Sequence, residues 1–134
     1  MTNSDVIMCY YSNLQSKAVC VDGWSDSRNA PPSDISLGAS SNLSDVSGSV
    51  TDGRTKVTFT RKLDTGDSKD LPIEKGKEMN VIFSYRNNGN PDTENGNFLQ
   101  HSRFISKDIV LYAYELIQKV SKLILVLVFA LIFS

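Results

Sequence analysis

Residues 55–63 alternate between apolar and polar side chains, and this period of two is typical of a half-buried β-strand. One face of this strand would carry Val57, Phe59, Arg61 and Leu63, and the other Thr58, Thr60 and Lys62. The chain has 134 residues, of which 40% are hydrophobic, so it can bury one modest core. The alternation therefore predicts a single, mainly β domain.

Other strand-like segments lie at residues 6–11, 17–24 and 80–85, with shorter ones near 35–37 and 46–50. Clusters of Ser, Asp, Asn, Gly and Pro separate them. Short strands at this spacing are typical of an antiparallel sandwich or barrel.

The pattern changes after residue 105. Ser106 could cap a helix, and the unbroken apolar run at 123–133 has 11 residues. As a helix this run would be about 16 Å long, and only an extension back to Ile109 would cross a hydrocarbon core of about 30 Å. We expect a hydrophobic helix over 106–133 and favour a membrane anchor over a core helix packed on the sheet.

The start of the chain has no basic region followed by an apolar core, which a secretory signal would show. Strand-like sequence begins at residue 5, so we expect that a further part, including a signal peptide, precedes this sequence. The anchor would then hold an extracellular or lumenal domain at a membrane.

Composition excludes several functions. A net charge of −1 argues against nucleic acid as a partner, because nucleic-acid binding needs a basic face. One histidine and two cysteines do not make a Cys/His zinc site, and no nucleophile motif accompanies His101. The sequence contains no complete catalytic machinery.

The turn at residues 12–16 predicts a hairpin centred between Leu14 and Gln15. Positions that sum to 29 would then face each other, which places Cys9 opposite Cys20. Opposed Cβ atoms lie about 4.5–5.5 Å apart, close to the span of a disulfide. A disulfide can form in an oxidising compartment if the register holds, because a slip of one residue would separate the pair, and both residues would stay thiols in the cytosol.

Two polar segments offer candidate sites of other kinds. Asn42 begins an Asn-Leu-Ser sequon, which makes it the candidate glycosylation site. Asp64, Asp67 and Asp70 lack the ligand spacing of a Ca²⁺ loop, so we interpret them as a solvated turn.

Five motifs occur in a fixed order: MxxxDVxxC at residues 1–9, a Tyr-rich hairpin, FTRKLDTGD at 59–67, VIFSY at 81–85 and QHS at 100–102. This order resembles the DOMON domain, the extracellular module named after dopamine β-monooxygenase, in the branch found in ferric-chelate-reductase-like proteins. The resemblance covers residues 1–102. It implies an immunoglobulin-like β-sandwich, which we expect to have seven to nine strands over 5–102 within a domain at 1–105.

In cytochrome members of this family the sandwich holds haem b between a Met and a His ligand and exchanges electrons with a six-helix haem domain in the membrane. The resemblance places His101 and Met1 at the two iron-ligand positions, with Met8 as an alternative thioether or a core residue. Arg61 alternates with the inner residues of its strand. If it is buried, it needs a carboxylate or a haem propionate as partner, and the alternative is an edge-strand arginine that reaches solvent.

Three functions follow from the sequence. The first is an extracellular haem-binding electron-transfer module that works with a membrane-bound haem reductase. The second is a ligand-binding or adhesion module without haem, and the third is a non-functional fragment.

Overall fold

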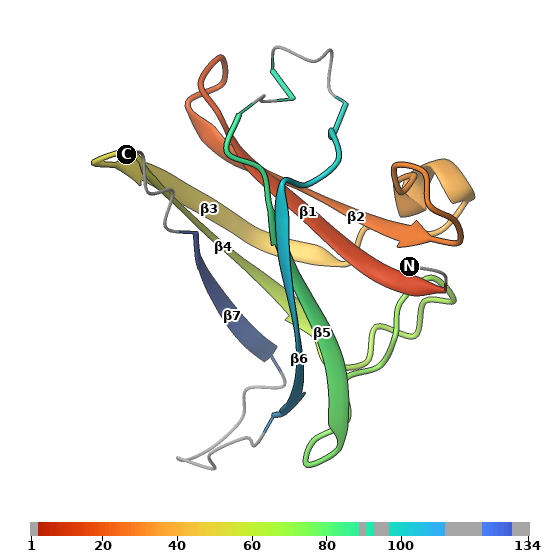
Figure 1. The fold of residues 1–134 in the computed structure, drawn as a ribbon. Coiled ribbons are helices and arrows are strands. Elements are labelled where there is room, and N and C mark those ends of the chain that lie inside the picture. Colours follow the sequence, from red (N-terminus) through yellow and green to blue (C-terminus); the bar gives the residue numbers. More distant parts are fainter. Residues whose placement is uncertain (1–2, 89–90, 93–96, 112–121, 130–134) are drawn as a thin grey trace.

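The computed structural model describes residues 3–88, 91–92, 97–111 and 122–129. Within these ranges the chain forms antiparallel strands and one short 3₁₀ helix, so the expected mainly β class is confirmed (Figure 1). The elements are β1 (Ser4–Ser12), β2 (Lys17–Ser25), η1 (Asp34–Leu37), β3 (Leu43–Thr51), β4 (Arg54–Lys62), β5 (Glu78–Tyr85), β6 (Arg103–Val110) and β7 (Lys122–Phe129).

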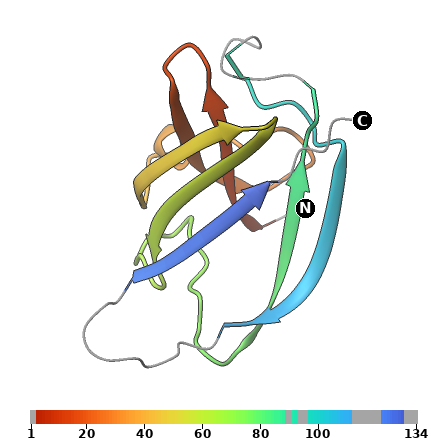
Figure 2. The ribbon, with the colours of Figure 1, turned by 90° about the vertical axis from the view of Figure 1, so that its left-hand side faces the viewer.

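The strands form three small sheets. β1 pairs with β2, β5 pairs with β6, and β4 lies between β3 and β7 in the third sheet. Figure 2 shows β3, β4 and β7 side by side, with β5 and β6 next to each other at the edge of the molecule. Every strand pair is antiparallel, and short turns join β1 to β2 and β3 to β4.

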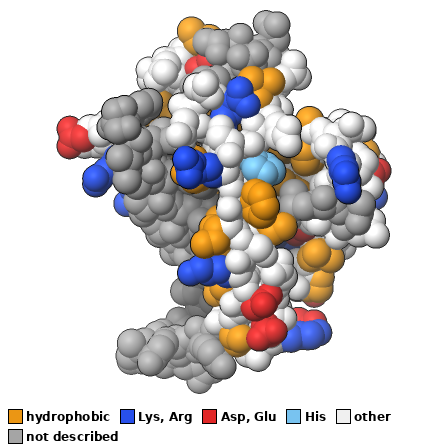
Figure 3. Space-filling view, in the orientation of Figure 1, with side chains coloured by type: hydrophobic (Ala, Val, Ile, Leu, Met, Phe, Trp, Pro, Cys, Tyr) orange, Lys and Arg blue, Asp and Glu red, His pale blue; other side chains and the backbone are white. Residues whose placement is uncertain are grey.

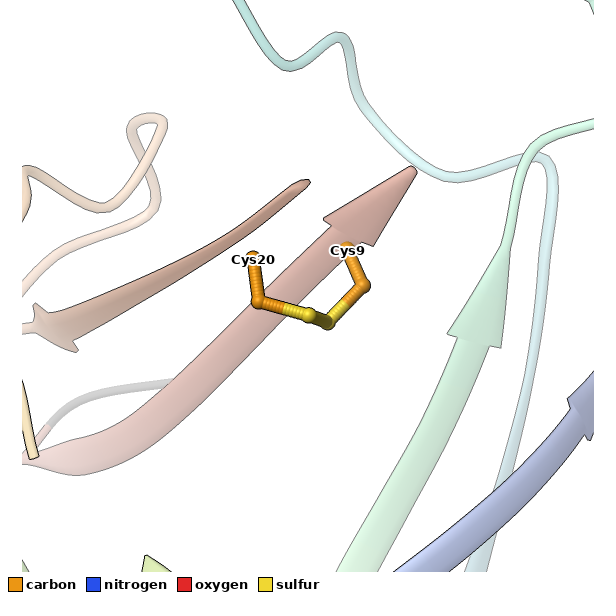
Figure 4. The surroundings of a disulfide bond; sticks show 2 residues. All are labelled: Cys9 and Cys20. Atoms are coloured by element: carbon orange, nitrogen blue, oxygen red, sulfur yellow. A yellow bond between two sulfur atoms is a disulfide. The ribbon is translucent and has the colours of Figure 1, made fainter. Parts of the chain in front are cut away.

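The β1–β2 hairpin has the register that its turn predicts. Ser12 faces Lys17 at the turn, and Cys9 faces Cys20 in the middle of the two strands. The two cysteines are 4.1 Å apart at Cα and are joined by a disulfide, which ties β1 to β2 (Figure 4). The disulfide fixes the register of this hairpin covalently.

The β1–β2 hairpin packs on the sheet of β3 and β4 through a small interior. Among the described residues the buried hydrophobic side chains are Ala18, Val57 and Phe59. Val57 and Phe59 lie on the face of β4 that the alternation predicts to be buried. Gly48 of β3 permits the close approach, because a Cβ at this position would lie 2.9 Å from the Cβ of Ala18.

The expected C-terminal helix over 106–133 is wrong for the residues that the structure describes. Residues 106–110 belong to β6, and 122–129 form β7, which pairs with β4 from Lys62–Lys122 to Thr55–Phe129. A continuous apolar run fits a strand inside a sheet as well as a buried helix, and the period alone does not separate them. The rest of the expected helix lies outside the described residues.

No helix in the described ranges is long and apolar enough to cross a membrane.

Two expected short strands have different outcomes. The short strand expected near 35–37 is the 3₁₀ helix η1, which Ser33 caps by accepting a hydrogen bond from the Ser36 N–H, whereas the strand expected near 46–50 is part of β3. Five described strands, fewer than expected, begin before residue 102.

Candidate ligand cavity and buried ion-pair cluster

Described residues line an open cavity of about 910 Å³. Its wall comes from β1, from residues 25–31 after β2, from the β3–β4 hairpin, from the end of β5 and from residues 97–101. Sites for small molecules and cofactors usually have volumes of about 300–1,000 Å³. The cavity is therefore large enough for a ligand of cofactor size.

His101 lies on the wall of this cavity, two residues before the start of β6. The side chain is exposed, and its ring meets the ring of Phe104 edge-to-face at 5.5 Å between centroids. Figure 3 shows the histidine on the surface beside hydrophobic side chains. An exposed imidazole next to a cavity can reach a ligand or a metal ion.

The segment that carries His101 is attached to β5 and to β1. The Ser102 N–H donates to the Tyr85 carbonyl at 2.9 Å, and Arg86 Nη1 donates to the Gln100 carbonyl at 2.7 Å. The rings of Tyr10 and Phe98 meet edge-to-face, with centroids 5.6 Å apart. These contacts fix the segment that carries His101.

Of the two thioethers considered from the sequence, Met8 lines the cavity, and Met1 lies outside the described residues. Met8 lies in β1, and its side chain reaches Gly23 of β2. A Cβ built on Gly23 would lie 3.4 Å from the Met8 Cε. An imidazole and a thioether thus line the same cavity.

Arg61 is buried and is not part of the cavity wall. Its Nη2 lies 2.6 Å from Asp5 Oδ2 and 3.2 Å from Asp70 Oδ1, and it donates to the Leu71 carbonyl at 3.3 Å. Of the two partners that the sequence allows for a buried guanidinium, the structure therefore shows carboxylates.

These residues belong to a buried ion-pair cluster, which we define as Asp5, Asp22, Asp34, Arg61 and Asp70. Three carboxylate oxygens lie within 4.8 Å of one another here, one each from Asp5, Asp22 and Asp70. Backbone N–H groups also bind here, from Leu71 to Asp5 at 2.9 Å and from Asn42 to Asp22 at 2.8 Å. Carboxylate oxygens are the ligands that hard cations such as Ca²⁺ prefer. Here the Arg61 guanidinium pairs with two of the three carboxylates, those of Asp5 and Asp70.

Burial raises the pKa of several carboxyl groups in the cluster. Desolvation is the largest cause for Asp5 and Asp22, and Arg61 opposes it in both. Asp34 is fully buried, and neither of its carboxylate oxygens has a hydrogen-bond partner among the described residues. Desolvation, and then repulsion from Asp22, Asp70 and Asp5, raises the pKa of Asp34 to about 6.

The turn at residues 64–70 is only partly as expected. Asp67 accepts backbone N–H bonds from Lys69 and Ser40, each at 2.9 Å, and these bonds lower its pKa. The interpretation of Asp70 as solvated is wrong, because this residue is 8% exposed and pairs with Arg61.

The sequence analysis missed Asp22 and Asp34 entirely. A signal for Asp22 was present, because an aspartate between Val21 and Gly23 in an apolar strand must be buried with a partner or lie at an edge. No comparable signal marks Asp34.

Asn42 is half-buried beside the cluster. With its amide oriented so that both atoms are satisfied, the nitrogen donates to Asp70 Oδ2 and to the Ser40 carbonyl, each at 3.1 Å. Glycosylation of Asn42 stays a prediction. A glycan would occupy this same nitrogen, so glycosylation and full packing of the amide compete.

An antiparallel β domain with a cofactor-sized cavity and a buried ion-pair cluster is the class of protein that this geometry defines. Comparison with protein families gives a match to the DOMON domain over residues 1–86, well over half of the chain. The chain belongs to the DOMON domain family. Met8, Cys9 and Arg61 lie inside the matched residues, and His101 lies beyond them. Neither the curated proteins nor the solved structures give a match.

Proposed function

We propose that this chain is a haem-binding electron-transfer module of the ferric-chelate-reductase-like DOMON branch. The observation that supports it is the position of His101 and Met8 on the wall of one cavity. Imidazole and thioether are the two side-chain types that hold six-coordinate haem iron in electron-transfer proteins. The cavity volume and the aromatic side chains of its wall fit a planar apolar group.

His101 and a thioether would hold the iron. The resemblance assigns that thioether to Met1, and the cavity wall offers Met8. Haem with two axial ligands supplies one-electron chemistry without an open position for oxygen. The chain itself contributes the two ligands, the bonds that fix the His101 segment, and apolar side chains on the cavity wall that would contact the ring system.

The wider setting is part of the same proposal. The three sheets would be parts of one immunoglobulin-like sandwich, an arrangement that the packing of β2 on β3 supports. The disulfide favours an extracellular or lumenal location, because disulfides persist in oxidising compartments. A membrane-bound haem reductase would be the electron-transfer partner, and the membrane association would run through that partner.

The test is a titration of the purified chain with haem b, followed by absorbance in the oxidised and reduced states. We expect a low-spin, six-coordinate spectrum that His101→Ala abolishes while the chain stays folded. Ser102→Ala, at an exposed neighbouring position outside the cavity wall, is the matched control and should keep the spectrum. If the His101→Ala protein binds haem as tightly as the parent, His101 is not a ligand and the electron-transfer proposal fails.

A second pair of variants identifies the thioether. Met8→Leu should remove the iron–sulfur charge-transfer band if Met8 is the ligand, and Met79→Leu on β5, which lies outside the cavity wall, should leave the band unchanged. A band that survives both substitutions assigns the ligand to Met1.

The alternative function is a ligand-binding or adhesion module without haem. Its supporting observation is that His101 lies beyond the residues that match the family. This function predicts a colourless protein whose cavity binds apolar ligands equally well with and without His101.

A further inference from the structure

The charged side chains on the cavity wall all have the same sign. Among the described residues that line the cavity, Arg28 and Arg86 are charged, and there is no aspartate or glutamate. The whole chain has 14 basic and 15 acidic residues, so the cavity wall departs from the average composition. Charge of one sign around a concave site attracts ligands of the opposite sign.

The two arginines differ in how they are held. Arg86 uses Nε to donate to the Asn88 carbonyl and Nη1 to donate to the Gln100 carbonyl. A guanidinium has five N–H donors, so three remain available. Because both partners are neutral carbonyls, these bonds fix the side chain without neutralising its charge.

Arg28 lies on the segment between β2 and η1, on another part of the wall. Within the described part of the chain it makes neither an ion pair nor a hydrogen bond. Its side chain is exposed, so all of its donors can turn toward a ligand. Guanidinium groups bind carboxylates in a planar, two-point arrangement that the ammonium of lysine does not offer.

The rest of the wall combines apolar and aromatic side chains with Asn and Ser side chains. Tyr10 and Phe98 form an edge-to-face pair on this wall, and Val6, Val57 and Leu99 also line it. A ligand that contacts these side chains and the two arginines would have an apolar, ring-sized body and an acidic group at its edge.

We propose that the cavity selects apolar ligands that carry carboxylate or similar anionic groups, and that Arg28 and Arg86 bind those groups. This inference rests on the proposed function, because it assumes that the cavity binds a ligand. It is independent of the iron ligands, so it applies to haem, whose two propionates are such groups, and to a ligand without iron.

The test compares two fluorescent dyes of the same shape, anilinonaphthalene sulfonate, which is an anion, and the uncharged phenylnaphthylamine. Binding to the full chain is followed by fluorescence titration at low and high salt. Arg28→Gln should weaken binding of the anion about ten-fold, since one charged hydrogen bond is worth at least about that factor. The same change should leave the uncharged dye within about two-fold.

Lys107→Gln on β6 removes one exposed positive charge outside the cavity wall, and neither dye should respond to it. Arg86→Gln should weaken the anion as Arg28→Gln does. Arg86→Gln removes both the charge and the bond to the Gln100 carbonyl, so residues 97–101 could move. Arg86→Lys keeps the charge, and comparison of the two variants separates the effect of the charge from that of a displaced segment.

Three results can be distinguished. Selective weakening of the anion by the Arg28 and Arg86 substitutions, with added salt having the same effect, supports the inference. If both dyes bind and neither responds to the arginine substitutions, the inference is overturned and ligand binding in the cavity stands. If neither dye binds the folded chain, ligand binding in this cavity and its preference for anions both fail.

Discussion

Arg61 Nη2 lies 2.6 Å from Asp5 Oδ2, so a guanidinium of β4 is paired with a carboxylate of β1 inside the protein. Both side chains are less than 9% exposed, and Asp70 meets the same guanidinium from the turn after β4. A buried pair of this kind is costly to break, because the partner left behind is an uncompensated buried charge.

Arg61→Ala is expected to lower the free energy of unfolding by about 3–5 kcal/mol, since it leaves Asp5 and Asp70 buried without their cation. Urea denaturation followed by tryptophan fluorescence measures the loss. Lys62→Ala, at the exposed neighbouring position, should change stability by less than about 0.5 kcal/mol. Equal stability of the two variants would contradict the importance of the ion pair.

Asp34 makes stability depend on pH. Its pKa rises from 3.8 to about 6 on folding, so the folded state binds a proton more tightly than the unfolded state. The contribution is fully present below pH 3.8 and is lost as pH rises through about 6. The difference of about 2 units corresponds to about 3 kcal/mol as an upper value.

Asp34→Asn tests this dependence, because asparagine keeps the shape of the side chain and removes the titration. The variant should gain stability relative to the parent between pH 4 and 7, the range that brackets the pKa of about 6. Unfolding midpoints at several pH values, with Asp26→Asn on the exposed surface as the control, measure the gain. A stability difference that does not vary with pH would show that Asp34 stays ionised in the folded protein.

The disulfide of β1 and β2 should stabilise the hairpin. Removing both cysteines, as Cys9→Ala with Cys20→Ala, should cost about 2–3 kcal/mol, since the bond closes a loop with a sequence separation of 11 residues. Denaturation with and without a thiol reductant gives the measurement. Reduced parent protein should match the double variant, and a parent that is insensitive to reductant would argue against the bond.

Gly48 should tolerate no side chain. A Cβ there would overlap the Lys56 carbonyl and lie 2.9 Å from the Cβ of Ala18, so Gly48→Ala should cost about 1–3 kcal/mol. Ser49→Ala, at an exposed neighbouring position, should be nearly neutral. Thermal unfolding compares the two, and an unchanged midpoint for Gly48→Ala would mean that β2 and β3 do not pack this closely.

Local sequence patterns predicted those features of the fold that depend on neighbouring residues. The turn at 12–16 predicted the register that brings Cys9 to Cys20, and the alternation along β4 placed Val57 and Phe59 on the face that is buried. The same reasoning could not predict that residues 122–129 form a strand. An apolar run without alternation becomes strand or helix according to its neighbours, and here the open edge of β4 provides a partner.

The candidate site shows the same division. Arg61 stood out as a charge on an apolar face, but the sequence alone left open whether it is buried with a partner or reaches solvent at an edge. Its partners Asp5 and Asp70 come from two segments far from one another in sequence, and only the packing of β1 on β4 brings them together. The cavity was not predictable at all, because its wall combines five separate segments.

The bond from the Leu71 N–H to Asp5 joins positions that are 66 residues apart. Such a contact forms only after both hairpins exist and have docked, so it adds little to the transition state of folding. Loss of the cluster is then expected to accelerate unfolding and to leave the folding rate almost unchanged. The buried charges thus set the lifetime of the native state and not the speed at which the chain reaches it.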